Sequence, residues 1–215
     1  MDNRQKYINI NPKYFKLLSL NYFDKYMHDA LVYRDFMGCE GFKEDYLALH
    51  GIIREINPQS FCEIGTHLGE GTRIICNAMQ GRQVYSLDLP VRYDETKDIY
   101  LNWNSEKPEG KVGERCEFTY AQLFGNSKDF DFSPYYPIDA WYIDGRHNYE
   151  FCYADSINAL KSNPKVIIWH DTLMDGVQRA IYQIIEENKA LYEAYYIRGT
   201  RVSFILKKEK NNANK

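Results

Sequence analysis

One stretch of the chain, residues 61–72 (FCEIGTHLGEGT), constrains the fold more than any other part of the sequence. It begins with an apolar run, Phe61 to Ile64, that predicts a buried strand, and continues with glycines in the spacing G-x-x-x-G-x-G. The residues from Thr72 to Met79 then have the pattern of a helix. Glycines allow backbone N–H groups to approach a ligand closely, and a helix N-terminus adds partial positive charge. The stretch therefore predicts a cradle for a nucleotide-like ligand, although its spacing differs from the G-x-G-x-x-G fingerprint of dinucleotide-binding proteins.

The composition is that of an ordinary globular domain. A chain of 215 residues, 44% hydrophobic and 27% charged, fits one domain with an extra segment. The net charge of -3 lacks the basic excess of most nucleic-acid-binding proteins, so we expect no nucleic-acid partner. No apolar run approaches the ~20 residues of a membrane span, and the first residues lack the layout of a signal peptide. We therefore expect a cytoplasmic protein that does not engage a membrane.

The cysteines favour the same compartment. They are five in number, scattered, and without a C-x-x-C pair. This pattern argues against a disulfide framework and against a zinc site built from thiolates, and it is typical of a protein in a reducing environment.

Apolar periodicity divides the chain into alternating strands and helices. The sequence predicts strands at residues 61–64, 83–87, 116–120, 138–143 and 165–169, and helices at residues 12–36, 44–56, 72–79, 96–103, 149–161 and 175–188. Segments 191–197 and 202–207 flank the turn signal RGTR, which predicts a closing hairpin. This order predicts an α/β fold: a Rossmann-like, doubly wound sheet that is mostly parallel, with a C-terminal antiparallel hairpin.

We expect a single domain over residues 44–207, followed by a disordered tail at 208–215. Residues 1–43 form an N-terminal helical segment in this interpretation. Two readings of that segment remain open: a helix packed on the domain, or a lid or wall of the substrate site.

Polar residues concentrate at the predicted ends of the strands, where ligands bind in an open parallel sheet. Asp88 lies 23 residues after Gly65, at the end of the next strand. A carboxylate there can accept hydrogen bonds from the two hydroxyls of a ribose, and we favour this role over that of a loop residue that caps a turn.

Two further aspartates, Asp144 and Asp171, end neighbouring predicted strands, so their carboxylates are expected to lie close together. Such carboxylates repel each other unless a cation or a proton lies between them. A divalent metal with oxygen ligands, such as Mg²⁺, fits this arrangement. His170 is a third candidate ligand; because imidazole is a poor ligand for magnesium, His170 lies outside the ligand shell or the metal is manganese or iron. The alternative is that one aspartate caps a helix and no metal binds.

Two more titratable residues have candidate roles. His147 follows Asp144 in the sequence DGRH, and an imidazole with a pKa near ~6.5 suits a general base, although a single histidine is often structural. Glu63, near the end of the first strand, must be paired if it is buried. It could hold backbone N–H groups of the glycine stretch (residues 65–71) or reach a cationic amino group of the ligand.

These motifs together resemble a known family. CEIGTHLGEGT is similar to motif I of class I S-adenosylmethionine-dependent methyltransferases, and YSLD is similar to their acidic ribose-binding motif. AWYIDGRHNYE followed by VIIWHD resembles one branch, the metal-dependent O-methyltransferases that act on sugars and glycosylated natural products. The resemblance covers about residues 44–207.

The resemblance implies a role for each site residue. The cofactor S-adenosyl-L-methionine would bind at Glu63, Gly65, Thr66, Gly69, Asp88 and Asp144. The metal, Mg²⁺ or another divalent ion such as Mn²⁺, would bind at Asp144, His170 and Asp171. His147 matches the position of the general base. His170 departs from the family pattern, because its position is acidic in the best-matching sugar enzymes.

The expected function is therefore methylation of a hydroxyl on a sugar or a glycosylated natural product, by a divalent-metal-dependent enzyme. The expected partner is a small-molecule or saccharide acceptor, and such enzymes often form homo-oligomers. Three alternatives remain: a methyltransferase of a phenolic or catechol-like acceptor, a non-catalytic protein that binds S-adenosylmethionine, and a nucleotide-dependent oxidoreductase, whose glycine fingerprint is missing from the sequence.

Overall fold

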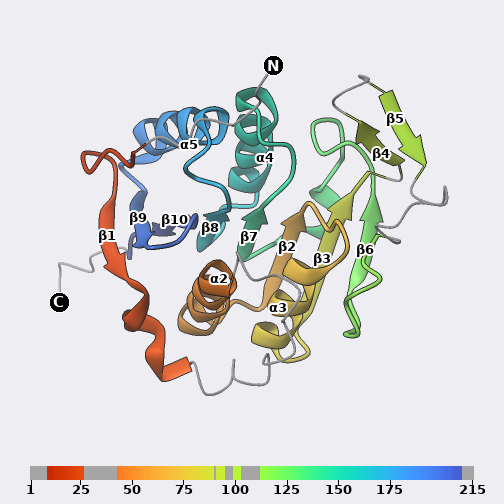
Figure 1. Ribbon diagram of the computed structural model, residues 1–215, viewed down its shortest axis with the longest axis horizontal. Helices are drawn as coiled ribbons and strands as arrows, with labels where there is room; N and C mark the ends of the chain where they lie inside the picture. The colour runs from red at the N-terminus through yellow and green to blue at the C-terminus, as the bar shows by residue number, and fades with distance from the viewer. Residues whose placement is uncertain (1–8, 27–42, 90, 95–98, 103–111, 210–215) are drawn as a thin grey trace.

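The computed structural model describes residues 9–26, 43–89, 91–94, 99–102 and 112–209 (Figure 1). Its centre is an eight-stranded sheet in the order β1-β9-β10-β8-β7-β2-β3-β6. The strands are β1 (Lys16–Ser19), β2 (Ser60–Ile64), β3 (Gln83–Asp88), β6 (Ala121–Phe124), β7 (Ala140–Ile143), β8 (Val166–Trp169), β9 (Tyr192–Arg198) and β10 (Ser203–Lys207).

The middle of the sheet is parallel and its C-terminal part is a hairpin. Strands β6, β3, β2, β7 and β8 pair in parallel, whereas β10 pairs antiparallel with both β8 and β9. Every residue of β7 (AWYI) and β8 (VIIW) is buried, as expected for parallel strands that are covered on both faces. The predicted Rossmann-like sheet with an antiparallel hairpin is confirmed.

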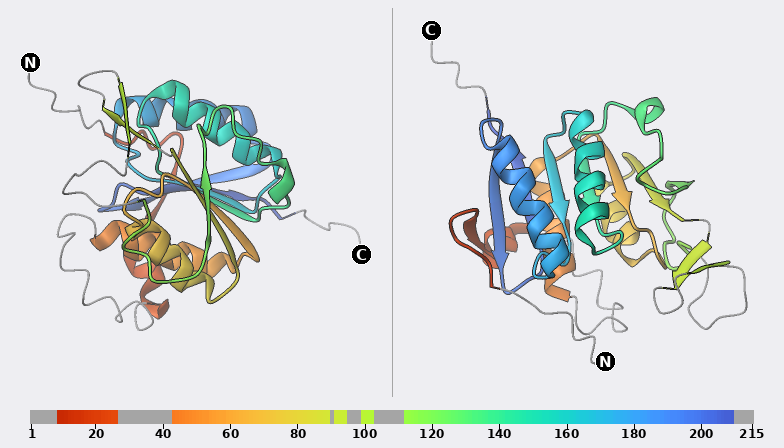
Figure 2. Two further views of the ribbon diagram at one scale, coloured as in Figure 1. Left: turned by 90° about the vertical axis from the view of Figure 1, so that its right-hand side faces the viewer. Right: turned by 90° about the horizontal axis from the view of Figure 1, so that it is seen from above.

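Helices cover both faces of this sheet, as Figure 2 shows. α2 (Lys43–Ile56) and α3 (Glu70–Met79) pack together on one face, and α4 (Tyr149–Lys161) and α5 (Asp175–Asn188) pack together on the other. Two hydrophobic clusters fill the layers between helices and sheet, one including Trp141 and Trp169 and the other including Ile53 and Phe204. The carboxyl ends of the parallel strands are left at one edge, where the site lies. Among the described residues, no helix is long and apolar enough to span a membrane.

The N-terminal segment differs from its prediction. Residues 16–19 form strand β1, which pairs in parallel with β9, and Leu20–Tyr26 form a 3₁₀ helix, η1. The helix predicted for residues 12–36 is therefore wrong over this part, and residues 27–36 of it lie outside the described residues. The apolar spacing did fit one face of a helix, but the free edge of β9 offers backbone hydrogen bonds that a strand can use. The role of the segment as a lid or substrate wall stays a prediction.

Two other local predictions are wrong. Residues 91–94 (β4, Val91–Asp94) and 99–102 (β5, Ile99–Asn102) pair as antiparallel strands, so the helix expected over residues 96–103 is wrong at residues 99–102; the rest of that range lies outside the described residues. The third strand lies at Ala121–Phe124 rather than at residues 116–120, because its register is set by pairing with β3. Upstream of β6, the backbone N–H groups of Gly113 and Arg115 donate to the carbonyls of His67 and Leu68 in the glycine stretch.

The contact between η1 and α2 gives a test of the corrected N-terminal structure. A β-carbon at Gly51 of α2 would lie 2.5 Å from Cβ of Phe23, which is buried in η1. Glycine to alanine inside a helix normally stabilises by roughly 0.5–1 kcal/mol, whereas overpacking a core costs about 1–3 kcal/mol. We therefore expect Gly51→Ala to lower the free energy of unfolding in urea. Adding Phe23→Gly, which removes Cβ as well as the ring of residue 23, should make the double variant less destabilised than the sum of the two single changes; simple additivity would contradict this packing.

Candidate active site

The glycine stretch joins β2 to α3 at the edge of the sheet where the parallel strands end. Gly65 and Gly69 both have positive φ, +104° and +97°, which side chains rarely tolerate. A β-carbon on Gly65 would lie 2.2 Å from the carbonyl oxygen of Asp144. The N–H of Gly65 donates to Leu87 at the end of β3, and the N–H of Asp144 donates to Ile64. The stretch is therefore tied by its backbone to both neighbouring strand ends.

Glu63 supports the glycine stretch from inside the core. Its side chain is fully buried, and one carboxylate oxygen accepts hydrogen bonds from the hydroxyls of Thr72 and Ser86, each at 2.5 Å. The other oxygen would be 2.7 Å from a β-carbon at Gly71, so this glycine lets the first turn of α3 approach the carboxylate. Burial raises the pKa of Glu63 to about 8, although the two hydroxyl donors act in the opposite direction. The predicted contact of Glu63 with the cofactor stays a prediction.

Thr66 is also buried, with 1% of its surface exposed. Its hydroxyl lies 2.6 Å from that of Ser86 and accepts a hydrogen bond from Nε2 of Gln122 at 3.0 Å. Like Glu63, Thr66 holds the glycine stretch onto the neighbouring strands β3 and β6.

Asp88 ends β3 beside the glycine stretch and is half-buried. Its two carboxylate oxygens accept hydrogen bonds from the backbone N–H groups of His67, at 2.6 Å, and Leu89, at 2.7 Å. Burial raises the pKa of Asp88, and the backbone donors oppose this effect. Asp88 thus caps the turn, as one reading expected, and each carboxylate oxygen keeps capacity to accept a further hydrogen bond. The ribose role stays a prediction.

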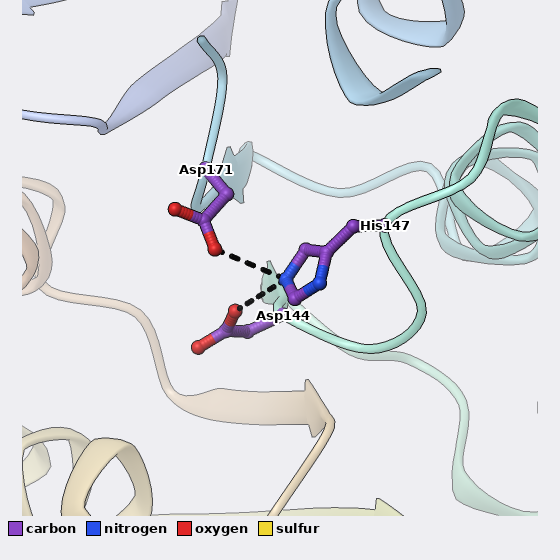
Figure 3. A group of neighbouring side chains, drawn as sticks. All are labelled: Asp144, His147 and Asp171. Carbon is purple, nitrogen blue, oxygen red and sulfur yellow. Dashed lines mark ion pairs between the residues drawn. The ribbon is translucent and has the colours of Figure 1, made fainter. Parts of the chain in front are cut away.

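Asp144 and Asp171 lie close together, as expected, and His147 lies beside them; the roles of the three residues in metal binding and catalysis stay predictions. β7 and β8 are parallel neighbours with Ile143 opposite Trp169, so the residues that follow them leave the sheet at one place. One ligand atom from each of the three residues lies within 4.8 Å of the others. Nε2 of His147 is 3.1 Å from Oδ2 of Asp171 and 3.6 Å from Oδ1 of Asp144, as Figure 3 shows. Asp171 has a left-handed backbone, with φ of +49°, an uncommon conformation for a residue other than glycine.

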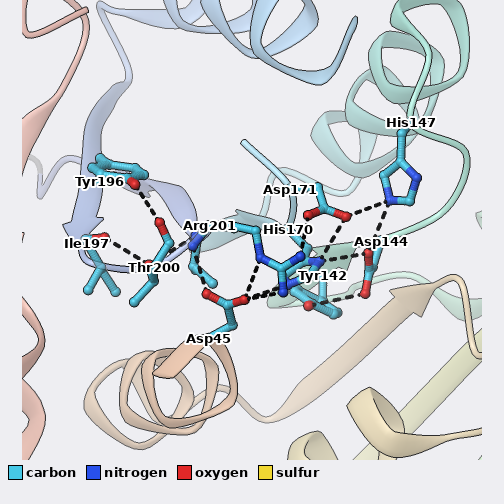
Figure 4. A network of polar contacts seen from close by, with 11 residues as sticks. Asp45, Tyr142, Asp144, His147, His170, Asp171, Tyr196, Ile197, Thr200 and Arg201 are labelled. Carbon is cyan, nitrogen blue, oxygen red and sulfur yellow. Dashed lines mark hydrogen bonds and ion pairs between the residues drawn. The ribbon is translucent and has the colours of Figure 1, made fainter. Parts of the chain in front are cut away.

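His170 lies on the other side of the same two carboxylates. Its Nδ1 is 3.2 Å from Oδ1 of Asp144 and 3.4 Å from Oδ2 of Asp171. Its Nε2 is 3.1 Å from Oδ2 of Asp45, near the start of α2. Figure 4 shows this network running from His147 through His170 to Asp45 and Arg201.

Sequence reasoning missed Asp45 and Arg201. Arg201 lies between β9 and β10, and its side chain donates to Asp45 and also to Asp171. The sequence carried only weak signals for them: Asp45 is an acid in the first turn of a helix, and Arg201 is in a turn.

The charges of this cluster stabilise one another. Burial by itself raises the pKa of Asp144 and lowers that of His147. The contacts reverse both effects: His170 and His147 bring the pKa of Asp144 to about 2, and Asp144 and Asp171 bring the pKa of His147 to about 9. The same histidines hold the pKa of Asp171 well below its usual range against the opposing effect of burial. The imidazoles and carboxylates of the cluster therefore favour one another's charged forms.

The burial of Glu63 predicts a pH dependence of stability. Because its pKa of about 8 in the folded chain exceeds the ordinary value of 4.5 for a glutamate, the folded state binds more protons between these values. Its contribution is fully present below pH 4.5 and is lost as the pH rises through about 8. We expect Glu63→Gln to remove this loss. The free energy of unfolding of the variant, measured relative to that of the wild type, should therefore increase from pH 5 to pH 8. The exposed control Glu150→Gln should run parallel to the wild type; a parallel profile for Glu63→Gln as well would show that Glu63 is not held protonated.

Comparisons with known proteins agree with this architecture. A family model described as a methyltransferase domain matches residues 62–172, just over half of the chain. No curated protein matches the sequence. The matched residues begin in β2, before the glycine stretch, and end just after Asp171, so they include the whole strand-end cluster apart from Asp45 and Arg201.

Several solved structures share the fold. An O-methyltransferase from Bacillus cereus, in complex with S-adenosylhomocysteine, is 16% identical over 93% of each chain, with a TM-score of 0.52. A putative caffeoyl-CoA O-methyltransferase from Staphylococcus aureus is 15% identical over 88% of this chain and 99% of that chain, with a TM-score of 0.53. TomG from Streptomyces achromogenes, an O-methyltransferase involved in tomaymycin synthesis and solved with S-adenosylmethionine, is 16% identical over 75% of this chain and 78% of that chain, with a TM-score of 0.51.

At these identities the structures establish the fold, and the family match establishes the kind of protein. The predicted resemblance is confirmed at this level: the chain belongs to the methyltransferase-domain family, as an S-adenosylmethionine-dependent methyltransferase of class I.

Proposed function

We propose that this protein is a divalent-metal-dependent O-methyltransferase that methylates a hydroxyl of a sugar or of a glycosylated natural product. The observation that carries the proposal is the meeting of Asp144, His147 and Asp171 at the strand ends directly beside the glycine stretch. A site for the methyl donor and a cluster suited to a hydroxyl acceptor are thereby adjacent.

The residues at this edge fit S-adenosylmethionine. Gly65 and Gly69 have positive φ, and a β-carbon at either would meet neighbouring backbone, so only glycine suits the turn that the cofactor would contact; half-buried Asp88 at the end of β3 is the proposed partner of the ribose hydroxyls. Asp144 connects the two halves of the site, because its backbone touches Gly65 and its carboxylate faces the cluster. When bound, the cofactor supplies an activated methyl group on a sulfonium, so the protein contributes mainly positioning and control of protons.

The cluster also fits a divalent cation. Oδ1 of Asp144 and Oδ2 of Asp171 converge with imidazole nitrogens, and carboxylate oxygens are the ligands that Mg²⁺ prefers, whereas imidazole suits Mn²⁺ or Fe²⁺ better. Asp144 and Asp171 would hold the ion, with His170 as the third candidate. Such an ion would lower the pKa of an acceptor hydroxyl, which is otherwise a weak nucleophile.

His147 is the proposed acceptor of the proton that the hydroxyl loses. It is the more exposed histidine of the cluster, with 35% of its side chain accessible against 6% for His170. Its Nε2 faces the carboxylates where an acceptor hydroxyl would be held. The carboxylates keep a proton on His147, so it can act as a base only when their charges are compensated in another way.

The sugar acceptor is supported by the resemblance of the DGRHNYE and HD motifs to sugar O-methyltransferases. A phenolic acceptor is the second candidate, since one structural neighbour is named a putative caffeoyl-CoA O-methyltransferase. Transfer of tritium from methyl-labelled S-adenosylmethionine to a panel of glycosides and catechols separates the two. We expect labelled glycosides; label only in catechols would contradict the sugar proposal, and no transfer to any hydroxyl compound would favour a non-catalytic role.

Removal of His147 tests the general base. We expect His147→Ala to lower kcat by about 10²–10⁴-fold, the usual contribution of general acid–base catalysis. Binding of S-adenosylmethionine, measured by calorimetry, should remain nearly unchanged because the cofactor residues are intact. Activity near that of the wild type would show that another group takes the proton.

Chelation tests the metal. We expect EDTA followed by gel filtration to abolish transfer, and added Mg²⁺ or Mn²⁺ to restore it, because the acceptor hydroxyl then regains its activating cation. Methyl transfer by the Asp171→Asn variant should not be restored at the same metal concentration. Full transfer by the chelated wild type would rule out the metal dependence.

A further inference from the structure

Two imidazoles contact the same pair of carboxylate oxygens. Oδ1 of Asp144 is 3.6 Å from Nε2 of His147 and 3.2 Å from Nδ1 of His170. Oδ2 of Asp171 is 3.1 Å from Nε2 of His147 and 3.4 Å from Nδ1 of His170. Either histidine could therefore supply a nitrogen to an ion held by the two aspartates, and the distances within the cluster do not distinguish them.

The two rings differ in what holds them. His170 is 94% buried and its second nitrogen, Nε2, faces Oδ2 of Asp45 at 3.1 Å. His147 lies on the loop after β7 and has a third of its side chain exposed. A histidine that binds a metal almost always donates its other ring N–H to a carboxylate or carbonyl, which fixes the tautomer and the orientation of the ring. Asp45 stands in that position toward His170.

Arg201 fixes both partners of this arrangement. Its Nε and Nη2 donate to Oδ2 of Asp45 at 2.9 and 2.7 Å, and its backbone N–H donates to Oδ1 at 2.7 Å. Its Nη1 donates to Oδ1 of Asp171 at 3.1 Å, which leaves Oδ2 of that residue directed at the histidines. The guanidinium of Arg201 thus orients the carboxylates of Asp45 and Asp171, which both contact His170. Figure 4 shows this chain of contacts.

We propose that Asp45 and Arg201 are positioning residues that make His170 a nitrogen ligand, so that the site selects a transition-metal ion such as Mn²⁺ or Fe²⁺ over Mg²⁺. This inference rests on the metal site of the proposed function. The donor set is two carboxylates and one imidazole, and imidazole nitrogen favours transition metals, whereas Mg²⁺ requires oxygen ligands. His147 is then left for the acceptor. Asp45 and Arg201 lie outside the residues that the family model matches.

Pulsed EPR of the full-length protein loaded with Mn²⁺ tests which atoms bind the ion. We expect ¹⁴N modulation from one directly coordinated imidazole, retained in His147→Ala and lost in His170→Asn. Modulation lost in His147→Ala and kept in His170→Asn would assign the nitrogen to His147 and overturn the proposal. A spectrum without nitrogen coupling in the wild type would also overturn it.

Calorimetric titrations with Mn²⁺ and with Mg²⁺ alone test the selection. We expect the wild type to bind Mn²⁺ more tightly than Mg²⁺. Asp45→Asn should weaken Mn²⁺ binding by about 10–100-fold and change Mg²⁺ binding much less, while the exposed control Asp175→Asn should change neither. Equal affinity for the two ions in the wild type, or unchanged Mn²⁺ binding in folded Asp45→Asn, would contradict the proposal.

Circular dichroism checks that Asp45→Asn folds. If it does not, the EPR comparison of wild type, His147→Ala and His170→Asn decides the question without that variant. The outcome is separate from that of the proposed function: a Mn²⁺ site made only of oxygens refutes the role of His170 but leaves metal-dependent methyl transfer intact. Loss of methyl transfer activity on chelation is measured independently.

Discussion

Two negative charges at the ends of adjacent strands set the constraint on which the rest of the site depends. Parallel pairing of β7 with β8 places Asp144 and Asp171 at the same edge, where neither carboxylate can stay ionised without compensation. His147, His170 and Arg201 supply positive charge around them, and Asp171 adopts a left-handed backbone to take its place. A local arrangement this demanding is typical of functional sites. In our account, a divalent cation takes over part of the compensation when the enzyme works.

The glycine stretch and the charged cluster are joined through the backbone of Asp144. Asp144 donates its backbone N–H to the last residue of β2, and its carbonyl oxygen lies where any side chain at Gly65 would be. Backbone contacts at the ends of β2, β3 and β7 therefore set the place of the glycine stretch relative to the cluster. Buried hydrogen bonds of the Ser86 hydroxyl with Glu63 and Thr66 attach the glycine stretch to β3. Such preorganisation is what a displacement reaction requires, because its rate depends on the alignment of two reacting groups.

The sequence predicted the centre of this arrangement better than its periphery. Buried parallel strands give continuous apolar runs, and ligands bind at their carboxyl ends, so the positions of Asp88, Asp144 and Asp171 followed from local pattern and one general rule. Asp45 and Arg201 could not be found in this way. They are 156 residues apart, and only the packing of α2 beside the closing hairpin brings them together. The N-terminal strand β1 was missed for a related reason, since its partner β9 is formed by the other end of the chain.

Anomalous diffraction from crystals grown with S-adenosylhomocysteine and Mn²⁺ tests the central claim most directly. The account predicts a manganese peak between the carboxylates of Asp144 and Asp171, with the nucleoside of the cofactor product along the glycine stretch and its ribose on Asp88. A nucleoside bound elsewhere, or clear density for it at this edge with no metal peak between the two aspartates at saturating Mn²⁺, would contradict a metal-dependent methyltransferase built on these strand ends.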